Sequence, residues 1–273
     1  MKNQNIIVLG SRGMLGQMVV EYFGNLNYHI FEFNERIDEL NIFRIIQQLN
    51  ELEDSVVINC IGKIKQKSSD AFTLLWSNAI LPLELNRSLK KGHILIQPST
   101  DCVFTGNKRS NYMVSDFNDA QDVYGWSKSL GETTLQHRPN TLIVRVSIIG
   151  PDEQSDKGLL SWFLNLKEGS HIKGYTNHIW NGITTLAWCI FIEDYLRSPS
   201  KTSYELNTVQ LGTTEVHNKY DMLVMFNEIF GKQINIEPVV EGEVISKCLN
   251  PDIICKDLRS QLTDLRDFLI NRK

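Results

Sequence analysis

The sequence of 273 residues has no hydrophobic run long enough to cross a membrane. Its first apolar stretch, Ile6–Leu9, is much shorter than a signal-peptide core, and the most apolar later stretch, Trp188–Leu196, is interrupted by two acids. A spanning helix needs about 20 apolar residues, and a secretory leader needs an apolar core of about 7–15. We therefore expect neither a membrane segment nor a leader, and we predict a cytoplasmic protein.

Cysteine is sparse and poorly arranged for cross-links or metal binding. The chain has five cysteines and six histidines, with no Cys-x-x-Cys pair and no spacing typical of a zinc site. We therefore expect reduced thiols, as in a cytoplasmic compartment, and no metal. The cysteines are Cys60, Cys102, Cys189, Cys248 and Cys255.

Neither sign of charge is in excess. The 28 basic and 32 acidic residues give a net charge of -4, which argues against a general surface for nucleic acid or anionic membranes. A local basic pocket for a phosphorylated ligand is compatible with that balance. Repeats and Pro/Gly-rich linkers are also missing, and the length suits one or two domains.

The first half of the chain alternates short apolar runs with longer amphipathic patterns. Strands are expected at Ile6–Leu9, Tyr28–Phe33, Ser55–Asn59, His93–Pro98 and Thr141–Val146. Helices are expected at Met14–Phe23, Ile42–Leu52, Phe72–Leu89 and Tyr124–Leu135. Apolar strands separated by helices indicate a parallel sheet with right-handed crossovers. We therefore predict an α/β fold built on a Rossmann-type, doubly wound parallel sheet.

Beyond Pro151 the alternation is less regular, which indicates a smaller C-terminal lobe. We place the Rossmann domain at residues 1–150 and the lobe at residues 151–273, with a strand near 204–209 that returns to the main sheet. The other elements expected here are helices at 159–166, 184–196, 216–230 and 257–269, and a strand at 234–239.

A glycine-rich turn follows the first predicted strand, with the sequence Gly10-Ser11-Arg12-Gly13-Met14-Leu15-Gly16. Between a strand and a helix, this spacing lets a pyrophosphate approach the N–H groups at the helix N-terminus. We therefore predict an NAD(P)-binding site. An acid at the end of the second strand would favour NADH, but Asn34 stands there, followed by Arg36. Arg12 and Arg36 favour NADPH and leave NADH open, and surface solvation is the competing explanation for Arg36.

A proton-donating centre is predicted from two further motifs. Tyr124 and Lys128 lie four residues apart, on one face of a predicted helix. Ser99-Thr100-Asp101 follows the fourth strand, at the edge where open parallel sheets bind ligands. A free tyrosine has a pKa of about 10, and we expect the Lys128 ammonium and an oxidised cofactor to lower it towards neutrality. Reduction of a ketone requires a hydride donor, here the cofactor, and an acid that protonates the developing alkoxide. Thr100 would hold the carbonyl oxygen in line, and Tyr124 beside Lys128 would be that acid.

Together these motifs resemble the extended short-chain dehydrogenases, and in particular the dTDP-4-dehydrorhamnose reductase group of nucleotide-sugar 4-ketoreductases. Asn59, Asn78 and Arg145 add to the resemblance, which spans nearly the whole chain. It implies NAD(P)H-dependent reduction of the 4-keto group of a nucleotide-linked 4-keto-6-deoxyhexose, with a homodimer left open. It also implies a cofactor site formed by Gly10, Arg12, Gly13, Met14, Leu15, Gly16, Asn34, Arg36, Asn59, Cys60, Ile61, Gly62, Asn78, Tyr124 and Lys128.

The substrate site implied by the same resemblance lies partly in the lobe. Its residues are Thr100, Asp101, Cys102, Lys173, His178, Trp180 and Asn181. Cys102 stands where the reductases usually have an aromatic residue, and it is similar in position to the acid/base cysteine of the epimerase/reductases, such as GDP-fucose synthase. A 3- or 3,5-epimerase/4-reductase is therefore an alternative function, for which Lys167, His171 and Lys173 are the candidate second acid/base groups. A small buried hydrophobe is the structural interpretation of Cys102.

Other conspicuous residues have structural interpretations. Tryptophans at helical spacing are expected to pack in the core or the lobe, and they are Trp76, Trp126 and Trp188. A basic loop after the third strand, with Lys63, Lys65 and Lys67, is expected to be solvated, although one lysine could meet a ligand phosphate. A non-catalytic NADP-binding regulatory subunit is a third reading of the whole chain, and the intact Thr100, Tyr124 and Lys128 set argues against it.

Overall fold

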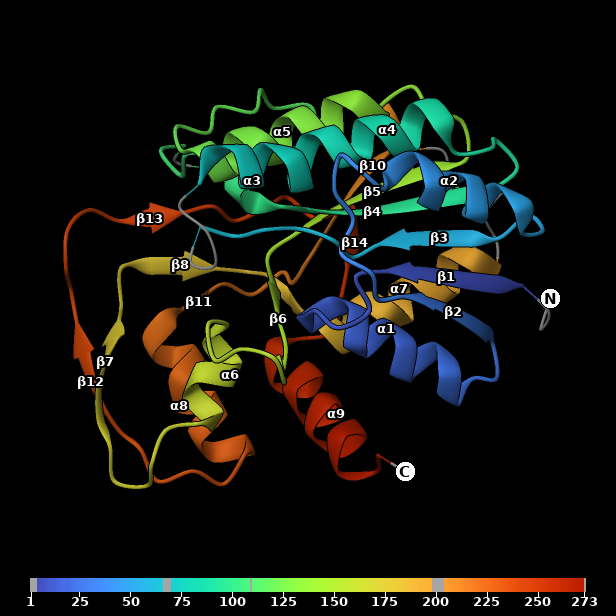
Figure 1. Cartoon of the computed structure of the whole chain (residues 1–273). Coiled ribbons are helices and arrows are strands. Elements are labelled where there is room, and N and C mark those ends of the chain that lie inside the picture. Colours follow the sequence, from blue (N-terminus) through green and yellow to red (C-terminus); the bar gives the residue numbers. More distant parts are fainter. Residues whose placement is uncertain (1–3, 66–69, 109, 198–203, 273) are drawn as a thin grey trace.

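A central parallel sheet organises the computed structural model, which describes residues 4–65, 70–108, 110–197 and 204–272 (Figure 1). Among these residues, seven strands follow the order β14-β10-β5-β4-β3-β1-β2. Their bounds are β1 (Asn5–Leu9), β2 (His29–Phe33), β3 (Val56–Asn59), β4 (Ile94–Thr100), β5 (Thr141–Val146), β10 (Thr208–Gly212) and β14 (Ile253–Ile254). Each neighbouring pair is parallel, so the predicted Rossmann-type fold is confirmed.

Helices cover both faces of the sheet, as Figure 1 shows. One face carries α2 (Ile42–Glu51), α3 (Ala71–Leu75), α4 (Leu81–Ser88) and α5 (Val123–Leu135), and the other carries α1 (Met14–Asn25), α7 (Thr185–Arg197) and α9 (Leu258–Ile270). Alternate side chains of a strand point to opposite faces. In β1, Ile6 and Val8 therefore join one core cluster, and Ile7 and Leu9 join the other.

The sheet changes its winding direction at β1. The chain runs from β1 to β2 on one side and returns to β3 on the other, where Leu9 pairs with Asn59. The Cys60 N–H donates to the Leu9 carbonyl oxygen at 2.9 Å, which brings the ends of β1 and β3 together. Ligands of doubly wound sheets bind beside the carboxyl ends of strands at such a point.

The remaining elements form the lobe, at the left of Figure 1. They are α6 (Leu159–Leu164), β7 (His171–Tyr175), β8 (His178–Trp180), β11 (His217–Asn218), α8 (Lys219–Ile229), β12 (Asn235–Val239) and β13 (Ile245–Ser246). Two short strands, β6 (Ile148–Ile149) and β9 (Ile183–Thr184), pair where the chain enters and leaves it. No helix in the described ranges is both long and apolar enough to cross a bilayer.

Three predicted elements differ most from their predicted form. The returning strand begins at Thr208 rather than near 204, because residues 205–207 form a 3₁₀ turn in which Leu206 has a φ of 51°. The helix expected at 216–230 begins at Lys219, since residues 217–218 pair with β8. The long helix expected at 72–89 contains a π-helical turn, η1 (Trp76–Ile80), between α3 and α4.

Candidate active site

Two adjoining cavities lie at the carboxyl edge of the sheet. The nucleotide cavity, of about 480 Å³, is lined by the glycine loop, the end of β2 and η1. The catalytic cavity, of about 370 Å³, is lined by the ends of β3, β4 and β5 and by α5. Gly13, Ile61 and Lys63 line both, so one extended ligand can occupy the pair.

The glycine loop forms a cradle whose shape depends on two of its glycines. Gly10 has a φ of +75°, which disfavours any residue with a side chain. A Cβ on Gly16 would lie 2.2 Å from the Gly10 carbonyl oxygen, so only glycine lets α1 start this close to the loop. Gly13 is the N-cap of α1 and provides no side-chain cap, which leaves the first N–H groups free to meet an anion. These features fit the pyrophosphate of a dinucleotide.

The end of β2 presents cations to the nucleotide cavity. The side-chain oxygen of Asn34 accepts a hydrogen bond from the Ser11 hydroxyl. Three acids also line this cavity, Glu35, Asp38 and Glu39. Glu35 accepts from Arg44 at 2.5 Å and from Asn41 at 3.1 Å, and Asp38 accepts from the Leu40 N–H at 3.1 Å. The exposed side chains of the two predicted phosphate partners, Arg12 and Arg36, line the same cavity. This arrangement suits an additional ribose phosphate.

Trp76 and Lys63 both line the nucleotide cavity. The sequence left a ligand contact open for one lysine of the basic loop but did not predict one for Trp76. Trp76, expected to be a packing residue, lines this cavity, and its indole Nε1 donates to the Ile37 carbonyl at 3.3 Å. Lys63 of the basic loop lines both cavities, whereas Lys67 lies outside the described residues. Trp126 is exposed rather than packed, and the prediction of a buried residue holds for Trp188.

Two buried amides position the loop that follows β3. Asn78 donates to the Lys63 carbonyl at 2.9 Å and accepts from the Lys63 N–H at 3.0 Å. It also donates to the Ser127 hydroxyl at 3.0 Å, which connects this loop to α5. Asn59 donates to Gln97 at 2.8 Å. Both predicted asparagines line the catalytic cavity, as do Met14, Leu15, Cys60, Ile61 and Gly62.

The predicted catalytic triad meets in the catalytic cavity. Thr100 ends β4, while Tyr124 and Lys128 lie on α5, and all three line the cavity. Close approach of α5 depends on Gly125, whose Cβ would lie 2.1 Å from the Cys102 carbonyl oxygen. The Thr100 hydroxyl is a hydrogen-bond partner of the Tyr124 phenol and donates to Asp101 at 3.0 Å. The site can therefore hold a carbonyl oxygen between two hydroxyl groups.

Burial governs the protonation of this site. It raises the pKa of Tyr124 above its usual range, with the neighbouring Cys102 as the second cause. The prediction that Lys128 lowers the pKa of Tyr124 is therefore wrong for the protein without cofactor. The Lys128 ammonium instead donates to the Pro98 carbonyl at 2.8 Å, and burial lowers the pKa of Lys128 to about 8. Tyr124 consequently stays protonated at neutral pH, which suits a proton donor.

A buried ion pair fixes α5 to the sheet behind the triad. Arg145 of β5 donates to Glu132 of α5 through Nη2 at 2.7 Å and through Nε at 3.1 Å. The two side chains are only 4% and 1% exposed, and Arg145 also donates to Gln210 of β10 at 3.0 Å. Arg145, which the resemblance singled out, therefore connects three elements that position Tyr124.

Of the predicted substrate contacts, Asp101 and Cys102 line the catalytic cavity beside Thr100. Trp180 lies behind its wall, because its indole Nε1 donates to Ser147, which does line the cavity, at 2.8 Å. His178 stacks on Tyr175 of the lobe, with ring centroids 4.7 Å apart. These two aromatic residues support the wall or the lobe rather than forming the lining.

Lys173 and Asn181, which were predicted to contact the substrate, do not line the catalytic cavity. Lys173 is exposed on β7, pairs with Glu241 at 3.1 Å and lines a separate surface cavity with His171. Asn181 is 3% exposed, and its amide is used by the Thr213 and Leu249 backbone. Lys167 and His171, the other candidate acid/base groups, are also absent from the lining of the catalytic cavity.

Sequence reasoning missed one wall of this cavity. The segment after β5 closes it through Ser147, Asp152, Gly158 and Leu159. The only sequence feature that could have indicated this wall is the position of Ser147, which directly follows a predicted strand at the ligand-binding edge of the sheet. Ser99 was quoted only as part of a motif, yet it is one of the residues that line the cavity, and its buried hydroxyl has no hydrogen-bond partner among the described residues.

The model of the family described as RmlD substrate binding domain matches residues 4–172. No curated protein matches the chain in sequence. The solved dTDP-4-dehydrorhamnose reductase from Bacillus anthracis str. Ames, in complex with NADP, is 19% identical, with a TM-score of 0.81 over 98% of this chain and 99% of that one. The dTDP-4-dehydrorhamnose reductase from Clostridium acetobutylicum ATCC 824 is 19% identical, with a TM-score of 0.80 over 98% and 100%. UDP-glucose 4-epimerase from Thermotoga maritima, with UDP-glucose, is 17% identical, with a TM-score of 0.74 over 98% and 99%. At these identities the likeness is one of fold.

Proposed function

We propose, from the premise that this chain belongs to the RmlD substrate binding domain family, that it reduces the 4-keto group of a nucleotide-linked 4-keto-6-deoxyhexose. NADPH is the proposed electron donor, with NADH as the weaker alternative. The single observation that carries the proposal is the meeting of Thr100, Tyr124 and Lys128 in one cavity that adjoins the glycine cradle.

The cradle and the two arginines would hold a dinucleotide. Its pyrophosphate fits the free N–H groups at the start of α1, and a 2′-phosphate fits Arg12 and Arg36. A bound nicotinamide supplies hydride chemistry at the catalytic cavity. The reductase from Bacillus anthracis in complex with NADP supports this choice of cofactor by its similar fold.

The chain's own groups would handle the proton. Tyr124, held protonated by burial, donates its phenolic proton to the ketone oxygen as negative charge develops there. Thr100 orients that oxygen and is itself fixed by Asp101. The positive charge of Lys128 lies in the same cavity and stabilises the resulting phenolate. Because the Lys128 ammonium is anchored on the Pro98 carbonyl, this charge keeps a fixed place.

A nucleotide sugar fits the position of the lobe. The lobe lies beside the catalytic cavity, and two of its lysines interact electrostatically with the acids and the thiol there. Cations at this place suit a diphosphate. UDP-glucose in the similarly folded epimerase from Thermotoga maritima supports this class of substrate. The five cysteines are free, as a reducing cytoplasm requires.

Tyr124→Phe tests the proposed chemistry. Removal of the phenolic proton should lower kcat for reduction by about 10²–10⁴, while the Kd for NADPH stays within about twofold. NADPH oxidation would be followed with dTDP-, UDP- and GDP-linked 4-keto-6-deoxy sugars, with products identified by mass spectrometry. Tyr195→Phe on α7 is the matched control and should leave kcat unchanged. A Tyr124→Phe enzyme within about threefold of wild type would falsify the assignment.

A further inference from the structure

Two neighbouring side chains at the end of β2 favour opposite cofactors. Glu35 and Arg36 follow that strand closely and line the nucleotide cavity, at the edge where the ribose of a dinucleotide binds. An acid at this place accepts from the ribose 2′-hydroxyl of NADH, whereas an arginine binds the 2′-phosphate of NADPH. The selectivity of the cavity therefore depends on what else each side chain contacts.

Glu35 is engaged by two residues at the start of α2. Its Oε1 accepts from Nη2 of Arg44 at 2.5 Å and from Nδ2 of Asn41 at 3.1 Å. Asn41 is the N-cap of α2, and Arg44 lies in the first turn of that helix. Neither of them lines the nucleotide cavity, so both hydrogen bonds draw the carboxylate towards α2 and away from the ribose site.

The side chain of Asn41 also fixes the backbone around these residues. Its Nδ2 donates to the Arg36 carbonyl oxygen at 2.8 Å, and its Oδ1 accepts from the Asp38 N–H at 3.0 Å. Residues 35–41 therefore form one hydrogen-bonded turn. In this turn Glu35 is held by the helix, while the exposed side chain of Arg36 lines the cavity.

The position of Arg44 is unfavourable for the helix alone. The dipole of a helix disfavours a cation in the first turn, so Arg44 is stabilised there by the Glu35 carboxylate. In return, the hydrogen bond from Arg44 is the largest of the causes that hold the pKa of the Glu35 carboxyl below its usual range. Glu35 is therefore ionised at neutral pH, and without Arg44 its charge would be uncompensated.

The charge balance of the cavity makes this compensation important for a phosphate. Among the described residues, the lining carries three cations and three acids, namely Arg12, Arg36, Lys63, Glu35, Asp38 and Glu39. These charges cancel within the lining. The guanidinium of Arg44, just outside it, supplies the additional positive charge that favours a ligand with one more phosphate.

We propose that Arg44 is a specificity-determining residue for the cofactor, because its pair with Glu35 removes an acid from the ribose site and leaves Arg36 to bind the 2′-phosphate of NADPH. Arg44 acts through Glu35, so it is a positioning residue. The inference rests on the proposed function for the identity of the cofactor. Without Arg44, Glu35 would repel the 2′-phosphate and accept from the 2′-hydroxyl of NADH.

Binding of two nucleotides that differ only at the ribose tests the proposal without turnover. The first, 2′,5′-ADP, carries the 2′-phosphate, and the second, 5′-AMP, has a hydroxyl group there. Their Kd values are measured by titration calorimetry, and we expect wild type to prefer 2′,5′-ADP. Arg44→Met should weaken 2′,5′-ADP binding by about 5-fold or more, the factor for a like charge about 4 Å away in water. The Kd for 5′-AMP should stay within about twofold or decrease.

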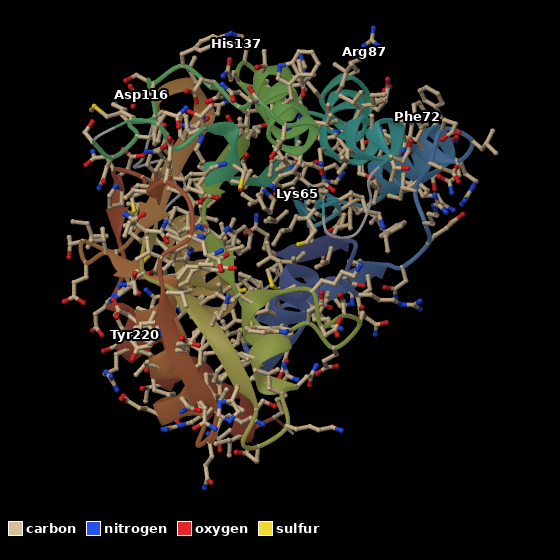
Figure 2. All side chains as sticks on the ribbon, turned by 90° about the vertical axis from the view of Figure 1, so that its left-hand side faces the viewer. Lys65, Phe72, Arg87, Asp116, His137 and Tyr220 are labelled. Atoms are coloured by element: carbon tan, nitrogen blue, oxygen red, sulfur yellow. The ribbon has the colours of Figure 1, made fainter. Side chains whose placement is uncertain are left out.

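A double-mutant cycle shows whether Arg44 acts through Glu35. Glu35→Gln alone should keep the preference for 2′,5′-ADP, and Arg44→Met should change neither Kd in that background, because no carboxylate is left to compensate. Arg87→Met is the control. It removes another exposed arginine, paired with Glu84 at 3.8 Å, whose side chain points away from the protein at the top of Figure 2. It should leave both Kd values unchanged.

Four results would overturn the proposal. They are a wild type without preference for 2′,5′-ADP, an Arg44→Met variant that keeps the wild-type preference, an equal loss of both nucleotides, and a loss that persists in the Glu35→Gln background. An equal loss would mean that Arg44 only supports the fold of this segment. A persistent loss would mean that it binds the phosphate itself.

The reductase proposal is tested separately, because no sugar takes part in these titrations. If none of the nucleotide-linked ketones is reduced while the Arg44 results hold, the reductase proposal is overturned and the role of Arg44 is supported. If wild type binds neither nucleotide, both proposals are overturned.

Discussion

Gly16→Ala probes the nucleotide cradle at a contact formed entirely by backbone. A Cβ on Gly16 would lie 2.2 Å from the Gly10 carbonyl oxygen and 2.8 Å from the Ser11 Cα. Because no side chain can rotate away, α1 must move roughly 1 Å from the loop, and a displacement of that size can cost about 100-fold at a functional centre. We expect the Kd for NADPH to rise about 100-fold, because the N–H groups at the start of α1 move with the helix.

Stability should also fall, since overpacking of this kind costs about 1–3 kcal/mol. For a chain of this size, that loss corresponds to a decrease in Tm of about 2–12 °C. NADPH fluorescence titration and thermal unfolding measure the two effects. Gly24→Ala is the control in the same helix, because a Cβ there meets nothing within 4 Å, and it should match wild type in affinity. A Kd for Gly16→Ala within about threefold of wild type would refute the reasoning.

Three further predictions address cofactor choice, pH and packing. Arg36→Ala should lower the ratio of kcat/KM for NADPH over NADH by about 10- to 100-fold, since a charged phosphate contact contributes about 1.5–3 kcal/mol. Equal losses with both cofactors would contradict this. The kcat/KM for reduction should fall as pH rises above 8, because Lys128, with a pKa of about 8, loses the charge that stabilises the phenolate; a flat profile to high pH would exclude that role. Glu132→Gln should lower the unfolding free energy by about 3–5 kcal/mol, because it leaves Arg145 buried and unpaired. Glu228→Gln is the control, because the Glu228–Arg259 ion pair has the same length of 2.7 Å but is half-exposed. In urea titrations it should lower the unfolding free energy by less than about 1 kcal/mol. Equal losses for Glu132→Gln and Glu228→Gln would refute the burial argument.

Features with a short sequence span were predicted well. The turn from Gly10 to Gly16 is specified by neighbours along the chain, so its place between β1 and α1 followed from the glycine spacing. The same holds for Tyr124 and Lys128, which share a helical face because they are four residues apart. Alternating apolar strands and helices predicted the parallel sheet for a similar reason, since a strand buried on both faces needs helices on both sides.

Features that depend on distant segments were not predicted. The π-helical turn that contains Asn78 is continuous with two α-helices, so its residues show no distinct pattern. Lys173 and Asn181 occur close in sequence to Trp180, but β7 turns Lys173 to the surface and packing buries Asn181. A strand or loop position therefore did not indicate which side chains reach the cavity.

The sequence by itself determined the order of elements in the first half of the chain, the phosphate-binding turn and the identity of the three proposed catalytic side chains. These depend on covalent spacing and on local backbone preferences, which the residue types carry with them. Only the tertiary structure decided that Tyr124 is held protonated by burial and that Lys247 of the lobe interacts electrostatically with Asp101 beside Thr100. Burial and electrostatic coupling depend on how segments more than 100 residues apart in the chain pack together and exclude water. A local pattern of residues contains no information about that packing.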